Sequence, residues 1–274
     1  SEAVSAEMTD GEIRYFTAIS SDGLYAGVFS TRDILVHLAN ITRKDVEMAR
    51  LLQSRIVQGS FRHDARRFGV RAFSRMALGV GGDFYSVREY APGRTHLAVA
   101  DVSGKGIAAS LITAVACGMC GSFDFTAGLT AYIRSVNDYL LNTFQSEKYL
   151  TGVFMDMDED KGRITIGDMG HSLVYLVRGS NPKRISLRET NFPVGIAQLD
   201  KIRTGTLPLI PGDLIFIATD GLTEQTSPER EEFGEERALG IIRELAAYDP
   251  ARIDHALITA LDTALARYDG VTGK

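Results

Sequence analysis

Tryptophan is absent from the 274 residues, proline occurs seven times and cysteine only twice. No apolar run approaches the roughly 18 residues of a membrane helix, and no signal-peptide pattern opens the chain. We therefore expect a cytoplasmic protein without a membrane segment. A basic excess is also missing, because the formal net charge is −5, which gives no electrostatic footprint for nucleic acid. With 45% apolar residues, the chain has enough for a core of its own.

The two cysteines, Cys117 and Cys120, form a Cys-x-x-Cys pair in "ACGMCGS". Such a pair is typical of half a zinc site or of a redox centre. A structural zinc site needs four ligands, and no second Cys or His cluster follows at a suitable spacing. Both cysteines fall in the apolar stretch that begins at Ile107, so we expect two buried helix residues.

The first 60 residues predict a hairpin followed by helices. Residues 12–30 form two strands around an Asp22-Gly23 turn, and Ser30 is placed to cap a helix over 31–39. A separate, highly charged helix is expected over 42–58, with an apolar stripe of Met48, Leu52 and Ile56. This connector helix packs either on the main domain or on a second copy in a homodimer, and helical spacing leaves both open.

From Phe61 onward the pattern alternates short strands with long helices, which is typical of an α+β layered domain. Helices are expected from Ile107, around residues 129–144, and from Glu235 to Ala266. "DEDKG" at 158–162 predicts a hairpin turn, and "GDLIFIATDG" predicts a fully buried strand.

Three predicted strand ends carry an aspartate next to glycine or a glycine-rich turn: Asp83 in "GVGGDFYS", Asp101 in "LAVADVSG" and Asp220 in "LIFIATDG". An ionised carboxylate at the end of an apolar strand is costly unless a positive charge neutralises it. No single Lys or Arg recurs beside all three, whereas Mg²⁺ or Mn²⁺ takes oxygen ligands of this kind. Each Asp-Gly pair taken alone can also be no more than a turn.

Two other motifs point elsewhere. "SGKG", with Lys105, suggests a nucleotide-binding loop, but the Walker spacing is missing because Gly106 stands where Ser or Thr is required. "DMDEDKG" resembles the start of a calcium loop at Asp156, Asp158 and Asp160, but it lacks the glycine and glutamate of that loop, which favours a solvated hairpin.

Taken in order, six motifs resemble the bacterial PPM-type serine/threonine protein phosphatases of the SpoIIE/RsbU class. The motifs are "VGGDFYSV", "VADVSGKGIAASLI", "MGHSLVYLVR", "FPVGI", "LIPGDLIFIATDGLTEQ" and "FGEERAL", and the resemblance covers about residues 45 to 270. The resemblance implies a four-layer αββα sandwich of two antiparallel sheets flanked by helices, with two Mn²⁺ or Mg²⁺ ions between the sheet edges. It further implies that Asp101 bridges the ions, the Val102 carbonyl binds one of them, Asp220 is a ligand, and Asp83 is a further carboxylate of the site.

The implied activity is hydrolysis of phosphoserine or phosphothreonine on a partner protein, of the anti-anti-sigma type in this class, by a metal-activated water attacking in line. Two departures from the class stand out. "DMGH" stands where the class shows Asn-Ala-Gly-His, and the class ends with an Asp-Asp-x-Thr segment whose second Asp binds metal. Here "RYDGVTGK", with Asp269 and Thr272, is either a degenerate form of that segment, with Gly270 in place of the ligand, or the sequence stops short of it. This missing ligand favours an alternative, a catalytically silent module that acts by binding. His171 of "DMGH" is expected to be a buried structural residue.

Residues 1–40 resemble the second part of a CBS motif, most clearly in "GVFSTRDIL". In CBS modules this helix start contacts adenosine nucleotides, which would involve Thr31 and Asp33, although a structural remnant of a sensor domain is the simpler interpretation. We therefore expect a CBS-like fragment at 1–40, a connector helix at 41–60 and a phosphatase domain at 61–274.

Overall fold

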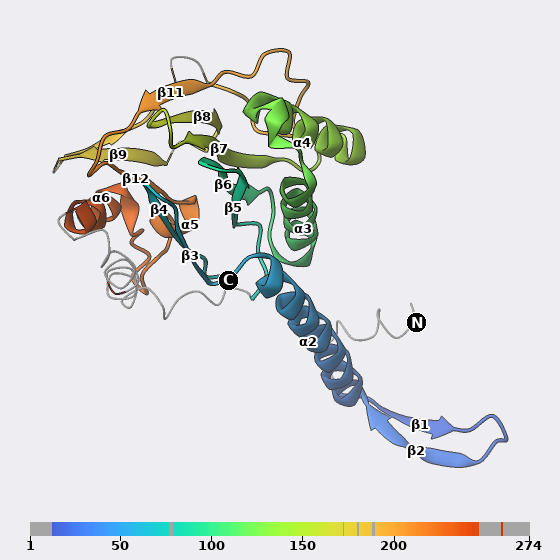
Figure 1. Ribbon diagram of the computed structural model, residues 1–274. Helices are drawn as coiled ribbons and strands as arrows, with labels where there is room; N and C mark the ends of the chain where they lie inside the picture. Colours follow the sequence, from blue (N-terminus) through green and yellow to red (C-terminus); the bar gives the residue numbers. More distant parts are fainter. Residues whose placement is uncertain are drawn as a thin grey trace. The chain divides into compact units, whose positions relative to one another are not determined.

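The computed structural model describes residues 13–76, 79–171, 173–179, 181–187, 190–246 and 259 (Figure 1). The chain divides into two compact units, residues 1–51 and residues 52–274. In the described part of the chain, no helix combines the length and the apolar character needed to cross a membrane.

The first unit begins with an antiparallel hairpin of β1 (Tyr15–Ile19) and β2 (Tyr25–Ser30). Gly23 has a φ of 80° in the turn between them, as the sequence predicts. Ser30 then caps α2 (Thr31–Ile56) in a reciprocal arrangement. The Asp33 amide donates to Ser30 Oγ at 3.2 Å, and the Ser30 amide donates to Asp33 Oδ2 at 2.8 Å. The predicted cap is confirmed.

The side chains that a CBS-type ligand would contact are both engaged in these local bonds. Asp33 is held by Ser30, and these hydrogen bonds lower the pKa of its carboxyl group. Thr31 is buried, and its hydroxyl oxygen accepts a hydrogen bond from the Arg14 amide at 3.2 Å. This arrangement supports a structural role for the segment.

Helix α2 is continuous over 26 residues, so the expectation of two helices separated near Asn40 is wrong. No proline or glycine occurs between Thr31 and Ile56, and nothing else in this stretch forces an interruption. Thr42, at the expected break, donates its hydroxyl proton to the Leu38 carbonyl at 3.1 Å, as threonine does inside helices.

The second unit contains two sheets and a hairpin, all antiparallel. The larger sheet has the strand order β11–β8–β7–β6–β5: Gly205–Pro208, Arg163–Met169, Leu150–Asp158, Arg94–Val102 and Phe84–Ala91. The smaller sheet has the order β10–β9–β12: Asn181–Arg184, Val174–Arg178 and Leu214–Ile217. The hairpin pairs β3 (Ser60–Asp64) with β4 (Gly69–Phe73).

Helices cover the larger sheet on one face (Figure 1). These are α3 (Gly106–Ser122), the 3-10 turn η2 (Phe125–Ala127) and α4 (Leu129–Phe144). Their apolar side chains form one buried cluster with β5, β6 and β7. A second cluster joins the two sheets, with Val153 and Ile166 packing near Val174. On the smaller sheet, α6 (Gly234–Ala246) packs Ile242 against Tyr175 and Val177. The prediction of an α+β fold with antiparallel sheets is confirmed.

Two predictions of burial need correction. Strand β12 was expected to be fully buried, but all four of its residues are half-buried. It pairs with β9 on one side, and in the described residues no strand pairs with its other side. Cys120 is buried on α3 as expected, whereas Cys117 is partly exposed, and both are free thiols. Burial raises the pKa of Cys117 to about 12, which leaves it unreactive. Asp269 and Thr272 lie outside the described residues.

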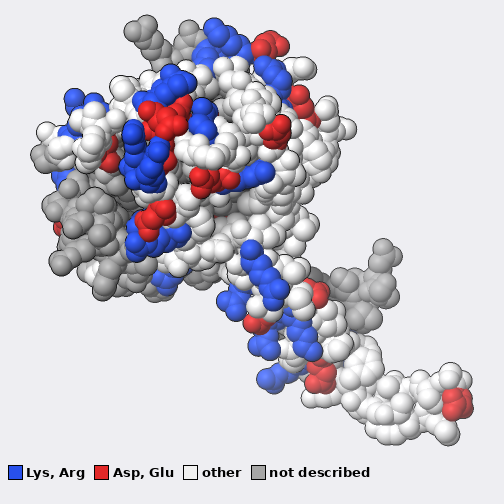
Figure 2. Space-filling view, in the orientation of Figure 1, with Lys and Arg blue, Asp and Glu red and all other residues white. Residues whose placement is uncertain are grey.

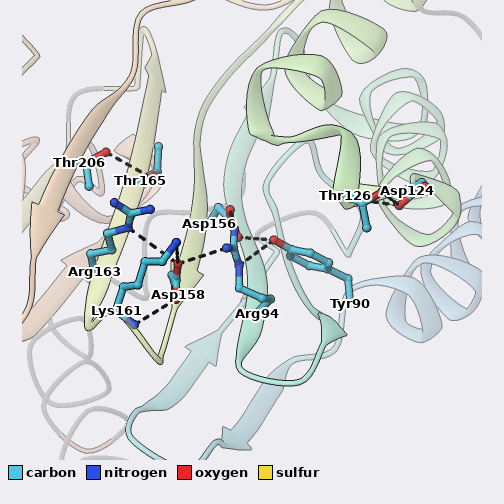
Figure 3. A network of polar contacts seen from close by, with 10 residues as sticks. All are labelled: Tyr90, Arg94, Asp124, Thr126, Asp156, Asp158, Lys161, Arg163, Thr165 and Thr206. Carbon is cyan, nitrogen blue, oxygen red and sulfur yellow. Dashed lines mark hydrogen bonds and ion pairs between the residues drawn. The ribbon is translucent and has the colours of Figure 1, made fainter.

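The acidic segment between β7 and β8 is a hairpin, as predicted, with Asp158 paired to Arg163. Figure 3 shows how its charges are balanced. Arg94 forms ion pairs with both Asp156 and Asp158, and Lys161 and Arg163 also approach Asp158, at 3.6 and 3.8 Å. Asp160 pairs with Arg66. These carboxylates are neutralised by side chains and have no need of a calcium ion.

The predicted stripe on α2 is open to solvent, since Met48, Leu52 and Ile56 are 59%, 59% and 43% exposed. Leu38 and Ile41 continue the same stripe toward the start of the helix, at 51% and 45%. Figure 2 shows Lys and Arg atoms along α2. In paired helices, charged residues typically flank an apolar stripe of this kind. The stripe therefore keeps the predicted homodimer open as a proposal.

If a second copy covers the stripe, Leu52→Glu should raise the dimer dissociation constant roughly tenfold to a hundredfold, because a buried leucine contributes about 1.5–3 kcal/mol. Sedimentation equilibrium of both proteins measures this. Asn40→Glu, an exposed position on the other side of α2, is the control and should leave the constant unchanged. A wild-type chain that stays monomeric throughout the micromolar range would contradict the proposal.

Candidate metal centre

Three aspartates from distant parts of the sequence meet at one point of the second unit. Asp83 immediately precedes β5, Asp101 is the penultimate residue of β6, and Asp220 begins the short helix α5 (Asp220–Thr223) after β12. Each offers one carboxylate oxygen, and these oxygens all lie within 4.8 Å of one another. Strands of both sheets therefore contribute, so the packing of the two sheets brings the three predicted site residues together.

The three carboxylates lack a basic partner: no ion pair found among the described residues includes any of them. Burial, followed by the charges of Asp83 and Asp220, raises the pKa of Asp101 to about 7. Burial is also the main cause that raises the pKa of Asp83. By contrast, the aspartates of the β7–β8 hairpin in Figure 3 are paired with Arg and Lys side chains. A site that holds carboxylates together in this way favours a cation from solution.

Gly82 allows the ends of β5 and β6 to approach each other closely. A Cβ atom at this position would lie 2.6 Å from the Val102 carbonyl oxygen and 3.0 Å from Asp101 Oδ1. The carbonyl predicted to bind metal and the carboxylate predicted to bridge thus both lie against the Cα atom of Gly82. The donor set, carboxylates with a backbone carbonyl, fits Mg²⁺ or Mn²⁺.

Three polar side chains that the sequence analysis missed hold Asp83 and its glycines. Gln53 of α2, 3% exposed, donates to the Gly81 carbonyl at 2.7 Å and accepts from the Gly81 amide at 3.1 Å. Thr113 of α3 donates to the Gly82 carbonyl at 2.9 Å, and Thr219 donates to Asp83 Oδ2 at 3.0 Å. The sequence does hold a signal for one of these contacts, because Thr113 is a polar residue on the helix face that also carries the buried Ala109 and Ala116.

His171 lies close to the same centre, after the end of β8. It is 9% exposed, so the expectation that it is buried is confirmed. Its Nε2 atom lies 2.7 Å from the carbonyl oxygen of Ala218, two residues before Asp220. Burial lowers the pKa of its imidazole, while Asp168, Asp220 and Asp83 oppose that shift.

The model of the family described as Stage II sporulation protein E (SpoIIE) matches residues 91–272. The chain belongs to the SpoIIE family. Asp101, Val102 and Asp220 lie inside the matched range and Asp83 precedes it. Among curated relatives, Protein IcfG of Synechocystis sp. is 22% identical over 227 residues, which is 73% of this chain and 36% of that protein. The chain thus spans about a third of that relative.

Solved structures show the same fold. The SiaA-PP2C domain of Pseudomonas aeruginosa has a TM-score of 0.67 at 18% identity and covers 85% of this chain and 93% of its own. The RsbU and RsbW domains of Rv1364c from Mycobacterium tuberculosis give 0.55 at 20% identity, over 69% of this chain and 52% of that one. At these identities the likeness establishes the fold.

Gly82→Ala should lower the affinity for Mn²⁺ by about tenfold or more, because the added methyl group displaces the Val102 carbonyl or the Asp101 carboxylate. Gly81→Ala is the matched control, since its methyl group would meet only the Met76 side chain, 3.6 Å away. Free Mn²⁺ measured by electron paramagnetic resonance during titration gives both affinities. Equal losses in the two variants would show that the close approach at Gly82 is unimportant.

Mn²⁺ affinity should also depend on pH, because a metal ion and a proton compete for Asp101. With its pKa raised to about 7, affinity should fall about tenfold for each pH unit below 7 and level off above it. In the metal-free protein, the contribution of Asp101 to the free energy of unfolding changes with pH in the opposite direction. A carboxyl group whose folded pKa is raised contributes less stability as pH increases toward 7. Affinity that is constant between pH 5.5 and 8 would contradict the assignment of Asp101.

Proposed function

We propose that this chain is a metal-dependent phosphatase that hydrolyses phosphoserine or phosphothreonine on a partner protein. The observation that carries the proposal is the convergence of Asp83, Asp101 and Asp220 within 4.8 Å in a member of the SpoIIE family. A hydrolase of this kind uses no covalent phosphoenzyme, which agrees with the absence of a reactive cysteine at the centre.

The proposed roles follow the resemblance to the SpoIIE/RsbU class. Asp101 would bridge two ions, Val102 would offer its carbonyl to one of them, and Asp83 and Asp220 would complete the carboxylate set. Bound Mn²⁺ or Mg²⁺ supplies a water of lowered pKa and neutralises phosphoryl oxygens. The residues of this chain hold the three carboxylates close together, with Thr219 fixing the orientation of Asp83.

The substrate would be a phosphoprotein in a partner-switching pathway, of the anti-anti-sigma type. This part of the proposal is supported by the resemblance to the SpoIIE/RsbU class and by the similarity to a protein that joins RsbU and RsbW domains. The formal charge of −5 is consistent with a protein partner rather than nucleic acid.

Helix α2 would control the centre through Gln53. The amide nitrogen and the amide oxygen of this side chain both bind the backbone of Gly81, and Gly81 precedes Gly82 and Asp83. A shift or rotation of α2 would therefore move Asp83 relative to Asp101, and ions with octahedral geometry tolerate little displacement of their ligands.

The test is release of phosphate from a serine-phosphorylated protein in the presence of Mn²⁺. Asp101→Asn should lower the rate by more than the roughly hundredfold that loss of an outer-shell partner can cost. Asp160→Asn, which removes an exposed carboxylate of the β7–β8 turn, should leave the rate unchanged. A wild-type chain that binds Mn²⁺ but releases no phosphate from several phosphoproteins would favour the alternative, a silent module that acts by binding.

A further inference from the structure

Asp220 depends on the backbone that precedes it, and His171 is the side chain that holds this backbone. The Ala218 carbonyl oxygen can only accept a hydrogen bond, so His171 Nε2 carries the proton and donates it over 2.7 Å. The amide of the same Ala218 donates to the Leu173 carbonyl at 3.3 Å. Both backbone polar groups of Ala218 are therefore bound to the connection between β8 and β9.

His171 is in turn fixed by a tight turn. Its amide donates to Asp168 Oδ1 at 2.8 Å, and the Leu173 amide donates to the His171 carbonyl at 3.0 Å. Gly170 adopts a φ of 81°, which few residues other than glycine adopt, and a Cβ there would lie 3.3 Å from Pro193. The backbone that carries the imidazole is thus fixed just beyond the end of β8.

The contact joins the two sheets at the metal centre. Asp168 lies near the end of β8 of the larger sheet and His171 in the connection from β8 to β9, whereas Ala218 follows β12 of the smaller sheet. Thr219 then binds Asp83, and the Glu224 amide binds the Asp220 carbonyl within α5 at 2.8 Å. Asp220 comes from the smaller sheet, while Asp83 and Asp101 come from the larger one, so their spacing requires a fixed link between the sheets.

We propose that His171 is a positioning residue for metal binding: its Nε2–H···O=C bond to Ala218 sets Asp220 at coordinating distance from Asp83 and Asp101. The inference rests on the proposed function, because it assumes that the three aspartates bind a metal ion. It gives the histidine of "DMGH" a role other than packing. Partners that orient metal ligands typically contribute tenfold to hundredfold in metal affinity.

The test compares three substitutions of His171 in the full chain, with Mn²⁺ as the probe. Glutamine can place an amide N–H near the position of Nε2, whereas the shorter asparagine places one near Nδ1 and does not reach Ala218. Phenylalanine keeps the ring but has no donor. We expect His171→Gln to retain most of the Mn²⁺ affinity, and His171→Asn and His171→Phe to lose about tenfold or more. Paramagnetic resonance gives the affinities, and circular dichroism verifies folding.

His96→Phe is the matched control, because His96 is a fully buried histidine stacked on Phe125, in the apolar cluster that α3 and α4 form with the larger sheet. It should leave Mn²⁺ affinity unchanged. If His171 only packs, phenylalanine should bind Mn²⁺ as well as the wild type and both amides should be impaired, which would overturn the inference; so would equal binding by all three variants. A folded wild-type chain that binds no Mn²⁺ contradicts the proposed function and this inference together. Should His171→Phe fail to fold, the difference between glutamine and asparagine decides.

Discussion

Mutual repulsion among Asp83, Asp101 and Asp220 is the constraint on which the second unit depends. Three carboxylates within 4.8 Å, none of them in an ion pair with Lys or Arg among the described residues, are unfavourable in the metal-free protein. Burial, followed by the charges of Asp83 and Asp220, raises the pKa of Asp101 to about 7. A divalent cation converts this cost into binding affinity. In the β7–β8 hairpin of the same unit, Arg94 and Lys161 neutralise Asp158 instead.

The surrounding structure holds the carboxylates in spite of that repulsion. Each reaches the centre from a different segment, and each segment is fixed by a specific contact. Thr113 holds Gly82 from the helix layer, Thr219 holds Asp83, and His171 holds the strand end before Asp220. Because Gln53 at the end of α2 binds the same glycine segment, the connector helix and the centre share one set of hydrogen bonds.

The sequence predicts much of this because strand ends and glycines are local signals. The hairpin turn at Gly23, the Ser30 cap and the strand ends at Asp83, Asp101 and Asp220 follow from short patterns. The contacts of Gln53, Thr113 and His171 span 28 to 47 residues and depend on how helices and sheets dock, which no local pattern specifies. The local pattern also predicts a break in α2 near Asn40, but Thr42 is tolerated inside the helix because its hydroxyl group bonds to the Leu38 carbonyl. The apolar residues of β12 predict full burial, but four apolar residues do not reveal whether a strand is paired on both sides.

The central claim is that the three aspartates form a metal centre, and a crystal structure of the full chain grown with Mn²⁺ tests it most directly. Anomalous diffraction above the manganese absorption edge should show at least one ion about 2.1 Å from carboxylate oxygens of Asp101 and Asp220, with the Val102 carbonyl facing the same site. Asp83 should lie within the coordination sphere or bind a coordinated water. Crystals at saturating Mn²⁺ with no anomalous peak between these residues, or with their carboxylates turned apart, would contradict the account.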